Sequence, residues 1–411
     1  MTTPPKPLPS SVIDEVLEIA QALREAGVQA QTFRQQPVDF WRHPHIERRI
    51  RQVANIVVAL NPEMLSQDHV TSLIHWPILV NLIDGRLYDS RETEVEPRDF
   101  IHQNLQPLTI YSATTDIEVP VLHCLSLRGE SFTWGPVTFK GVNPWSDLGD
   151  YEDLKLLIEH YDGRLNGMAS VSCPGDPSRA WAYLNDAIAA AHRELVGAAW
   201  PRHGGSGFVP PSVLGMGPDA SFTPLFEGGR HRALSFRTAS GHAPFRVPRD
   251  LEEEWGEVDF SRLTDIAKRD SRQRTEVENN TLSALRWLGA ATEPDIPSMK
   301  VVKVATALES LLGDPGPDAN VSSRGVTATL AERCAFLVGT TAAEKQQVHD
   351  QVVHLYDLRS RVLHQNATID PDEFANHGLT VWTACRKLTA LSADLKTRVD
   401  LRRWTLARRY E

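Results

Sequence analysis

The last third of the chain, from Glu276 onward, carries apolar residues every three or four positions, and this period restricts it to a helical fold. The breaks in the pattern fall where proline removes a backbone donor, or where glycine or asparagine accepts a left-handed cap. The expected helices occupy residues 276–291, 298–312, 323–338, 342–363 and 372–407. Because the connections between them are short, neighbouring helices should be antiparallel. The sequence therefore predicts an all-α, up-and-down helical bundle over residues 270–411.

The preceding part of the chain has a different pattern. Residues 1–10 are proline-rich and predict a disordered arm. Residues 11–265 combine helical stretches, such as 179–200, with short alternating runs between 108 and 142 that are typical of strands. We therefore expect a mixed α/β region over 11–265, as one domain or two, and an α+β fold class for the whole chain. A length of 411 residues is sufficient for such a division.

The composition narrows the class of protein. A net charge of −10 at pH 7 argues against a protein that coats nucleic acid nonspecifically, but it is compatible with a local basic site. The four cysteines are widely separated and have no histidine near them at ligand spacing, so neither a zinc site nor a disulfide framework is expected. The N-terminus lacks the apolar core of a signal peptide, and no apolar run is long enough to span a bilayer. We expect a cytoplasmic protein with no membrane segment, no metal and no cofactor.

One charged residue stands where the helical pattern calls for an apolar one. On a helix over 342–363, Arg359 falls near the middle of the apolar arc and Tyr356 lies at its edge. Burying a guanidinium without a partner is costly, so Arg359 requires either a partly open face or an assigned partner. Glu309, just off the apolar arc of the 298–312 helix, is available for an ion pair. The alternative is that Glu309 is solvated and Arg359 extends to the surface.

His364 lies at the end of the same helix, ahead of Pro371. At this position the negative end of the helix dipole favours the protonated imidazole. On an ideal helix His364 points about 140° away from Arg359, so the two side chains do not share a face. A common site requires that the arginine reaches around the helix, that the last turn unwinds, or that the site forms across a dimer. The alternative is that His364 is an ordinary helix-end residue.

Three blocks in the last third of the chain resemble the HEPN family, in its ApeA-like branch. The R-x4–6-H signature of that family resembles the string that contains Tyr356, Arg359, Ser360 and His364. The block ALESLL at 307–312 is similar to the second helix of that branch, and AERCAFL at 331–337 falls where its third helix would lie. Gln365 follows the histidine where the family commonly has glycine, which leaves the helix end less easily capped but removes no catalytic group.

The resemblance implies a metal-independent endoribonuclease that works as a homodimer, with the arginine and histidine of both protomers facing one cleft. In this chemistry the RNA 2′-hydroxyl attacks the neighbouring phosphorus and leaves a 2′,3′-cyclic phosphate and a 5′-hydroxyl. Histidine suits the proton transfers and arginine suits the phosphate oxygens, so His364 would be the general acid/base and Arg359 would bind the phosphate. The residues expected to support this pair are Arg361, as a second phosphate contact, Glu309, which would orient Arg359, and Tyr356 and Ser360.

The resemblance also implies a toxin-like role in bacterial defence against phage. The N-terminal region would then sense a phage-derived or cellular trigger and restrain the enzyme. Two alternatives stay open. The bundle would be a non-catalytic dimerisation or ligand-binding module if Arg359 and Glu309 form a structural ion pair. The chemistry would instead lie in the first 260 residues if a deep pocket with convergent polar groups is found there.

Overall fold

A computed structural model describes residues 6–28, 44–85, 87, 94–112, 114–122, 131–141, 165–203, 212–213, 223–227, 230–235, 249–293, 297–313, 325–365 and 370–408. The chain forms two compact units, Met1–Ile117 with Val171–Leu184, and Glu118–Ser170 with Asn185–Glu411. It combines many helices with a small sheet, so the expected α+β class is confirmed. None of the helices in the described ranges combines the length and the apolar character that crossing a membrane requires.

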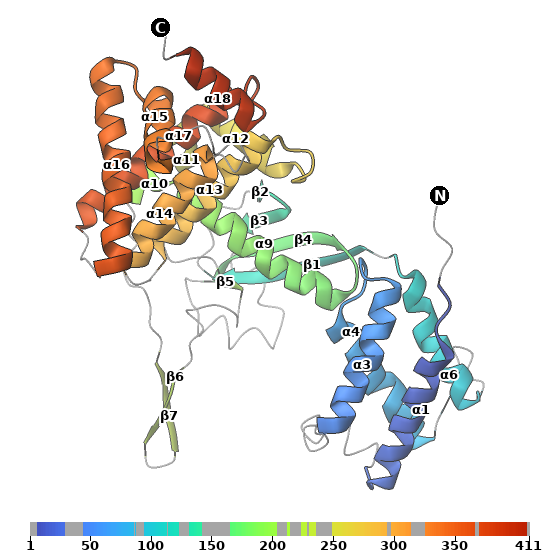
Figure 1. Cartoon of the computed structure of the whole chain (residues 1–411). Helices are drawn as coiled ribbons and strands as arrows, with labels where there is room; N and C mark the ends of the chain where they lie inside the picture. Colours follow the sequence, from blue (N-terminus) through green and yellow to red (C-terminus); the bar gives the residue numbers. More distant parts are fainter. Residues whose placement is uncertain are drawn as a thin grey trace. The chain divides into compact units, whose positions relative to one another are not determined.

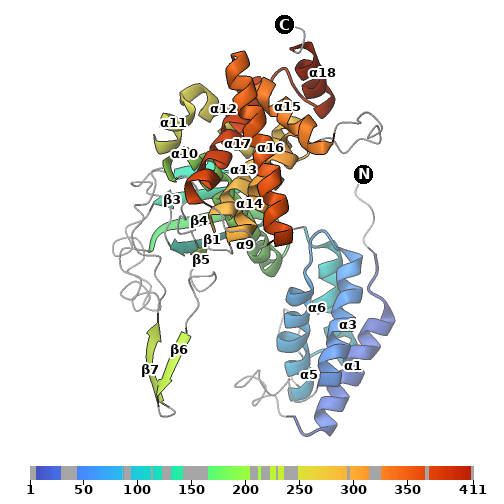
Figure 2. The same ribbon diagram turned by 60° about the vertical axis from the view of Figure 1, so that its left-hand side comes forward.

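The described part of the first unit is mainly helical (Figures 1 and 2). Its elements are α1 (Ser10–Glu25), α3 (Pro44–Leu60), α4 (Gln67–Leu73), the π-helical turn η2 (Ile74–Leu79), α5 (Val80–Asp84), α6 (Pro97–Leu105) and the 3-10 turn η3 (Gln106–Ile110). The apolar sides of these helices share one core that includes the fully buried Val16, Ile19, Ile50 and Val57. The 171–184 segment is joined to it by the buried Asp176, whose carboxylate accepts hydrogen bonds from the backbone and hydroxyl of Ser66, the N-cap of α4.

The predicted disordered arm over 1–10 is wrong for its second half. α1 begins at Ser10, and Leu8 is buried in the core of the first unit. The backbone N–H of Leu8 also donates a hydrogen bond of 2.9 Å to Oε1 of Gln106. Pro9 fits before the helix because its φ of −62° suits an extended N-cap. Residues 1–5 lie outside the described residues.

A five-stranded sheet in the order β2-β3-β4-β1-β5 belongs largely to the second unit. Its strands are β1 (Thr114–Leu122), β2 (Ser131–Trp134), β3 (Val137–Gly141), β4 (Leu165–Pro174) and β5 (Ser212–Val213). β3 is antiparallel to both β2 and β4, and β1 is antiparallel to β5. A separate antiparallel hairpin is formed by β6 (Thr223–Glu227) and β7 (Arg230–Ser235). Of the strands expected between 108 and 142, those at 114–122, 131–134 and 137–141 are present, residues 106–110 form η3 instead, and residues 123–130 lie outside the described residues.

The helices of the second unit pack on this sheet and on one another. They are α9 (Pro177–Ala198), whose first residues lie in the first unit, α10 (Trp200–His203), α11 (Arg249–Trp255), α12 (Glu257–Lys268), α13 (Glu276–Thr292), α14 (Pro297–Leu312), α15 (Val326–Val338), α16 (Ala342–Gln365), α17 (Pro371–Leu391) and α18 (Arg398–Ala407). On β2, the fully buried Trp134 stacks on Phe260 of α12 with ring centroids 6.5 Å apart. Its Nε1 donates a hydrogen bond of 2.8 Å to Glu194 of α9, whose other carboxylate oxygen pairs with Arg286 of α13.

The predicted helices of the last third agree closely with α13 to α16, but the single helix expected over 372–407 is wrong. The structure divides it into α17 and α18. The second begins at Arg398 and is preceded by the N-cap Thr397, which forms a capping box with Asp400. In this motif the two side chains satisfy backbone N–H groups that a continuing helix would have bonded internally. The sequence feature that marks the division is therefore the N-cap of a new helix, and not a proline or glycine that ends the previous one.

The two compact units do not divide at 265–270, where a change in composition suggested a boundary. α12 and α13, which flank that position, belong to the same unit. α13 also lies directly on α9, because a Cβ added at Gly289 would be 1.9 Å from the carbonyl oxygen of Arg193. A Cβ at Gly197 of α9 would likewise be 2.0 Å from the carbonyl oxygen of Leu285. The C-terminal helices thus share their interior with elements that precede them by about a hundred residues.

Candidate functional site

The residues predicted to carry the chemistry lie on two helices that pack together, α14 and α16 (Figures 1 and 2). The apolar arc expected for α14 is buried, including Val304, Leu308 and Leu311. On α16 the same holds for Val352 and Leu358. Two apolar arcs of this kind explain why the helices form and pack, because each offers a stripe at the helical period. Glu309 and Arg359 stand at the border of this contact.

Arg359 is paired with Glu309, which is one of the two arrangements that the sequence left open. Its Nη1 lies 3.8 Å from Oε1 of Glu309, and the exposed fractions of the two side chains are 34% and 35%. The pair is a single ion-pair contact and not a bidentate one. The guanidinium carbon also lies 5.9 Å from the ring centroid of Tyr356, a distance compatible with a cation–π contact. Within the described part of the chain, Nε of Arg359 is buried without a hydrogen-bond acceptor.

Tyr356 joins the same group. Its hydroxyl donates a hydrogen bond of 3.1 Å to Oε1 of Glu309, the oxygen that also faces Arg359. Burial, together with the negative charge of Glu309, raises the pKa of Tyr356 well above its ordinary value. The residue is therefore a neutral phenol at physiological pH and acts as a hydrogen-bond donor. Glu309 is held from two sides, which fixes the carboxylate that in turn faces the guanidinium.

His364 is exposed in the last turn of α16, next to the final residue of the helix. Among the described residues no hydrogen bond or ion pair joins it to Arg359. An ideal helix separates the two by about 7.5 Å along its axis and about 140° around it. The chain thus presents the arginine at the border of the α14–α16 contact and the histidine to solvent at the helix end.

The two remaining predicted residues also lie on the outer part of α16. The Nε of Arg361 is 3.2 Å from Oδ2 of Asp357, one turn earlier on the same helix, and 42% of the arginine side chain is exposed. Ser360 is exposed. An exposed ion pair of this kind contributes little to stability, so Arg361 can exchange Asp357 for another anion at low cost.

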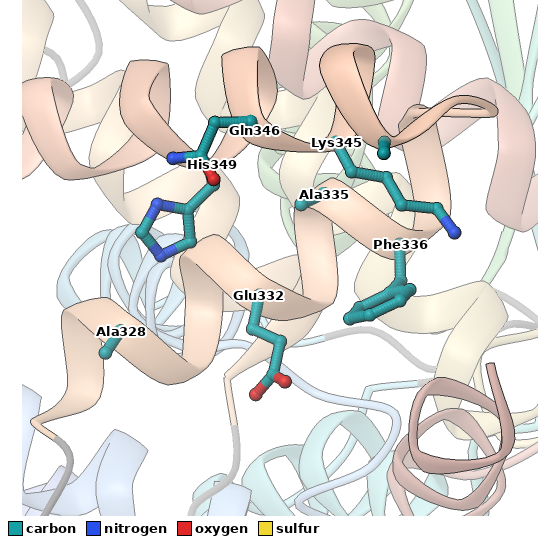
Figure 3. A pocket seen from close by; sticks show the side chains of 8 residues that line it. Ala328, Glu332, Ala335, Phe336, Lys345, Gln346 and His349 are labelled. Atoms are coloured by element: carbon teal, nitrogen blue, oxygen red, sulfur yellow. The ribbon is translucent and has the colours of Figure 1, made fainter. Parts of the chain in front are cut away.

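A groove of about 490 Å³ lies between α15 and the first half of α16 (Figure 3). Half of its lining residues are small or apolar, and the other half are polar, namely Glu332, Lys345, Gln346 and His349. The ammonium of Lys345 lies 4.8 Å from the ring centroid of Phe336 at one end of it. None of the residues predicted to carry the chemistry lines this groove.

A second cluster of polar side chains was not predicted. His354 of α16 and Glu373 and His377 of α17 place their possible ligand atoms within 4.8 Å of one another. The signal in the sequence was the spacing of Glu373 and His377, four residues apart and therefore on one face of a helix. That signal is weak without knowledge of which helix packs opposite.

Comparisons of the chain with protein-family models, with curated proteins and with solved structures give no match. The HEPN resemblance therefore stays a prediction from three short sequence blocks.

Proposed function

We propose that the C-terminal helices form a HEPN-type endoribonuclease in which His364 transfers protons and Arg359 binds the scissile phosphate. The observation that supports this most is the arrangement around Arg359. A guanidinium in a mostly apolar border is held by Glu309 and Tyr356 and still keeps about one third of its side chain in solvent. That exposure leaves the guanidinium accessible to a phosphate group, whose oxygens its planar fork can bind.

The proposed reaction needs no group outside the chain and its RNA. The 2′-hydroxyl loses its proton to a base and attacks phosphorus, and the 5′-oxygen leaves with a proton from an acid. These two transfers are suited to imidazole, whose pKa lies near neutrality. The phosphorane between them carries extra negative charge, which a fixed guanidinium stabilises. The products are a 2′,3′-cyclic phosphate and a 5′-hydroxyl, so the atoms balance without water or metal.

We further propose that the site is composite. One chain supplies one His364, while the reaction needs a base and an acid on opposite sides of the phosphorus. Two protomers that face each other through the ends of α16 would supply both histidines and both copies of Arg359. Arg361, whose present partner is the exposed Asp357, would add a second phosphate contact. Ser360 is exposed on the same turn and would lie in the same cleft.

The biological role proposed with this activity is that of a toxin-like effector in antiviral defence. An enzyme that destroys cellular RNA has to be restrained, and the first unit together with the sheet is large enough to hold a sensor for a phage-derived or cellular trigger.

The test is cleavage of a 5′-labelled RNA by the purified full-length chain and by His364→Ala and Arg359→Ala variants. We expect each variant to lose about 10²–10⁴-fold in rate. His349→Ala is the matched histidine control, since His349 lies on the same helix and is accessible, and Arg403→Ala is the exposed arginine control. The product end should be resistant to phosphatase until the cyclic phosphate is opened with acid.

The composite site has its own test. Two differently tagged chains, one wild type and one His364→Ala, are co-expressed and the mixed dimer is isolated. If both histidines are used, the mixed dimer is nearly inactive. If it keeps half of the wild-type rate, each protomer works alone and the composite site is wrong.

A second candidate function is favoured by the Glu309–Arg359 contact itself. In that case the bundle is a non-catalytic dimerisation or ligand-binding module, and the pair only fixes α14 against α16. The two functions predict different results for the wild type and for His364→Ala. If the bundle is only a dimerisation or ligand-binding module, the wild type cleaves no RNA under any trigger, and His364→Ala keeps the oligomeric state of the wild type.

A further inference from the structure

The cluster of His354, Glu373 and His377 lies on a different side of α16 from Arg359. Arg359 faces α14 through Glu309, whereas His354 faces α17. The Nε2 of His354 is 3.1 Å from Oε1 of Glu373, and the rings of His354 and His377 have centroids 5.4 Å apart. One residue of the cluster comes from α16 and two from α17, four residues apart.

His377 is the unusual member. The residue is only 5% exposed, and its Nε2 is buried with no hydrogen-bond partner among the described residues. A buried polar atom without a partner costs about 1–3 kcal/mol. Burial, and to a smaller extent the neighbouring His354, lowers the pKa of His377 to about 4, so the ring is neutral and keeps a free lone pair.

The contact between His354 and Glu373 explains only part of this cluster. The Nε2 of His354 and Oε1 of Glu373 lie 3.1 Å apart, and this contact does not involve His377. The adjacent Thr380 already has partners, because its hydroxyl bonds to Gln351 and to the backbone of Asn376. What this contact leaves unexplained is the buried His377, whose Nε2 has no partner among the described residues and which offers a possible ligand atom within 4.8 Å of those of His354 and Glu373.

We propose that His354, Glu373 and His377 bind one divalent transition-metal ion, for which Zn²⁺ has the most suitable chemistry. Two imidazoles and one carboxylate are a common set of zinc ligands. In a tetrahedral site, bonds of about 2.0–2.2 Å place ligand atoms about 3.4 Å apart. His354 and Glu373 already approach that separation at 3.1 Å, and the third ligand atom lies within 4.8 Å of the others. Rotation of the side chains would bring all three ligand atoms to the separation that a tetrahedral ion requires.

The ion would have an open position. Three protein ligands leave the fourth site to water or a substrate atom. The side chains of His354 and Glu373 are 42% and 33% exposed, so solvent reaches the cluster from that side while His377 closes the other. The ion would join α16 to α17 and stabilise the folded second unit, because it binds the folded chain and not the unfolded one.

The experiment uses the full-length chain and Zn²⁺ alone. Competition with a chromophoric chelator gives the affinity, and elemental analysis after desalting gives the stoichiometry. We expect one ion per chain, an upward shift in melting temperature with added Zn²⁺, and an affinity at least about tenfold weaker in His354→Ala and in Glu373→Gln. These two positions are partly exposed, so their variants should fold, whereas buried His377 is left unchanged. His349→Ala, with a histidine outside the cluster on the same helix, should bind as the wild type does.

Binding of no stoichiometric ion, or equal affinity in Glu373→Gln and the wild type, would overturn the metal site and leave only the contact between His354 and Glu373. The measurement contains no RNA, so its outcome does not depend on the ribonuclease proposal. Loss of RNA cleavage in His364→Ala with intact zinc binding would separate the two sites directly.

Discussion

The hydroxyl of Tyr356 lies 3.1 Å from Oε1 of Glu309, and that oxygen is also the one that faces Arg359 at 3.8 Å. Replacing Tyr356 with phenylalanine removes the hydrogen bond and keeps the ring beside the guanidinium. We expect a loss of about 0.5–1.5 kcal/mol in the free energy of unfolding, the usual net value of one hydrogen bond. We also expect slower RNA cleavage, because a less constrained Glu309 holds Arg359 less firmly. Urea denaturation measures the first effect and single-turnover cleavage the second.

Glu309→Gln is the companion variant. It keeps an acceptor for Tyr356 and removes the charge opposite Arg359. If the two variants change stability alike but only Glu309→Gln changes cleavage, the charge positions the arginine and the phenol is structural. Equal cleavage by both variants and the wild type would contradict a positioning role for this group.

Gly289→Ala should destabilise the second unit. Alanine is a better helix former than glycine by about 1 kcal/mol, which alone would stabilise α13. The new Cβ, however, would be 1.9 Å from the carbonyl oxygen of Arg193, and a backbone atom cannot turn aside as a side chain can. Overpacking typically costs about 1–3 kcal/mol, so we expect the cost of the clash to exceed the gain in helix propensity. Differential scanning calorimetry checks this, with Gly325→Ala as the control, because nothing lies within 4 Å of a Cβ there.

Glu194→Leu tests the polar contact in the interior. The Glu194 side chain is 6% exposed and accepts a 2.8 Å hydrogen bond from Nε1 of the fully buried Trp134. Leucine leaves that N–H without a partner, at a cost of about 1–3 kcal/mol. Glu194→Gln retains an acceptor and should cost less. Chemical denaturation followed by tryptophan fluorescence compares the two, and equal losses would show that only the charge matters.

Stability should fall on mild acidification. His192 is 4% exposed, and burial lowers its pKa from 6.5 to about 3. Below pH 6.5 the imidazole of His192 binds a proton in the unfolded chain, whereas in the folded chain it stays neutral down to about pH 3. Stability contributed by the neutral ring is therefore complete above pH 6.5 and decreases as the pH falls. Between pH 7 and pH 5 the loss is about 2 kcal/mol, at 1.36 kcal/mol per unit of pKa difference.

His377, with its pKa lowered to about 4, adds to the same trend. His192→Gln should therefore reduce the dependence on pH without abolishing it. The check is the unfolding free energy at pH 5, 6 and 7 for both chains. An unchanged slope in the variant would show that His192 does not titrate in this window.

Much of the fold of the last third follows from its sequence, because apolar residues at the helical period specify α13 to α16 nearly to their ends. The contact of Arg359 with Glu309 was one of two arrangements that the sequence allowed, since a charge on an apolar arc requires a partner or an open face, and Glu309 stood at the edge of the apolar arc of another helix. The division of residues 372–407 was missed because Thr397 and Asp400 form a cap without any proline or glycine. The cluster at His354 was missed for another reason. Its members are separated along the chain by up to 23 positions, and only the packing of α16 on α17 brings them together.

The close approach of α9 and α13 at Gly197 and Gly289 limits how this chain can be divided or recombined. A C-terminal fragment that starts near residue 270 would expose the side of α13 that touches α9, and nothing in the fragment could replace it. The ribonuclease that we propose could therefore not be transferred to another protein as residues 270–411 alone. The segment that contains α9 and the C-terminal helices would have to be inherited together, because α9 packs directly against α13.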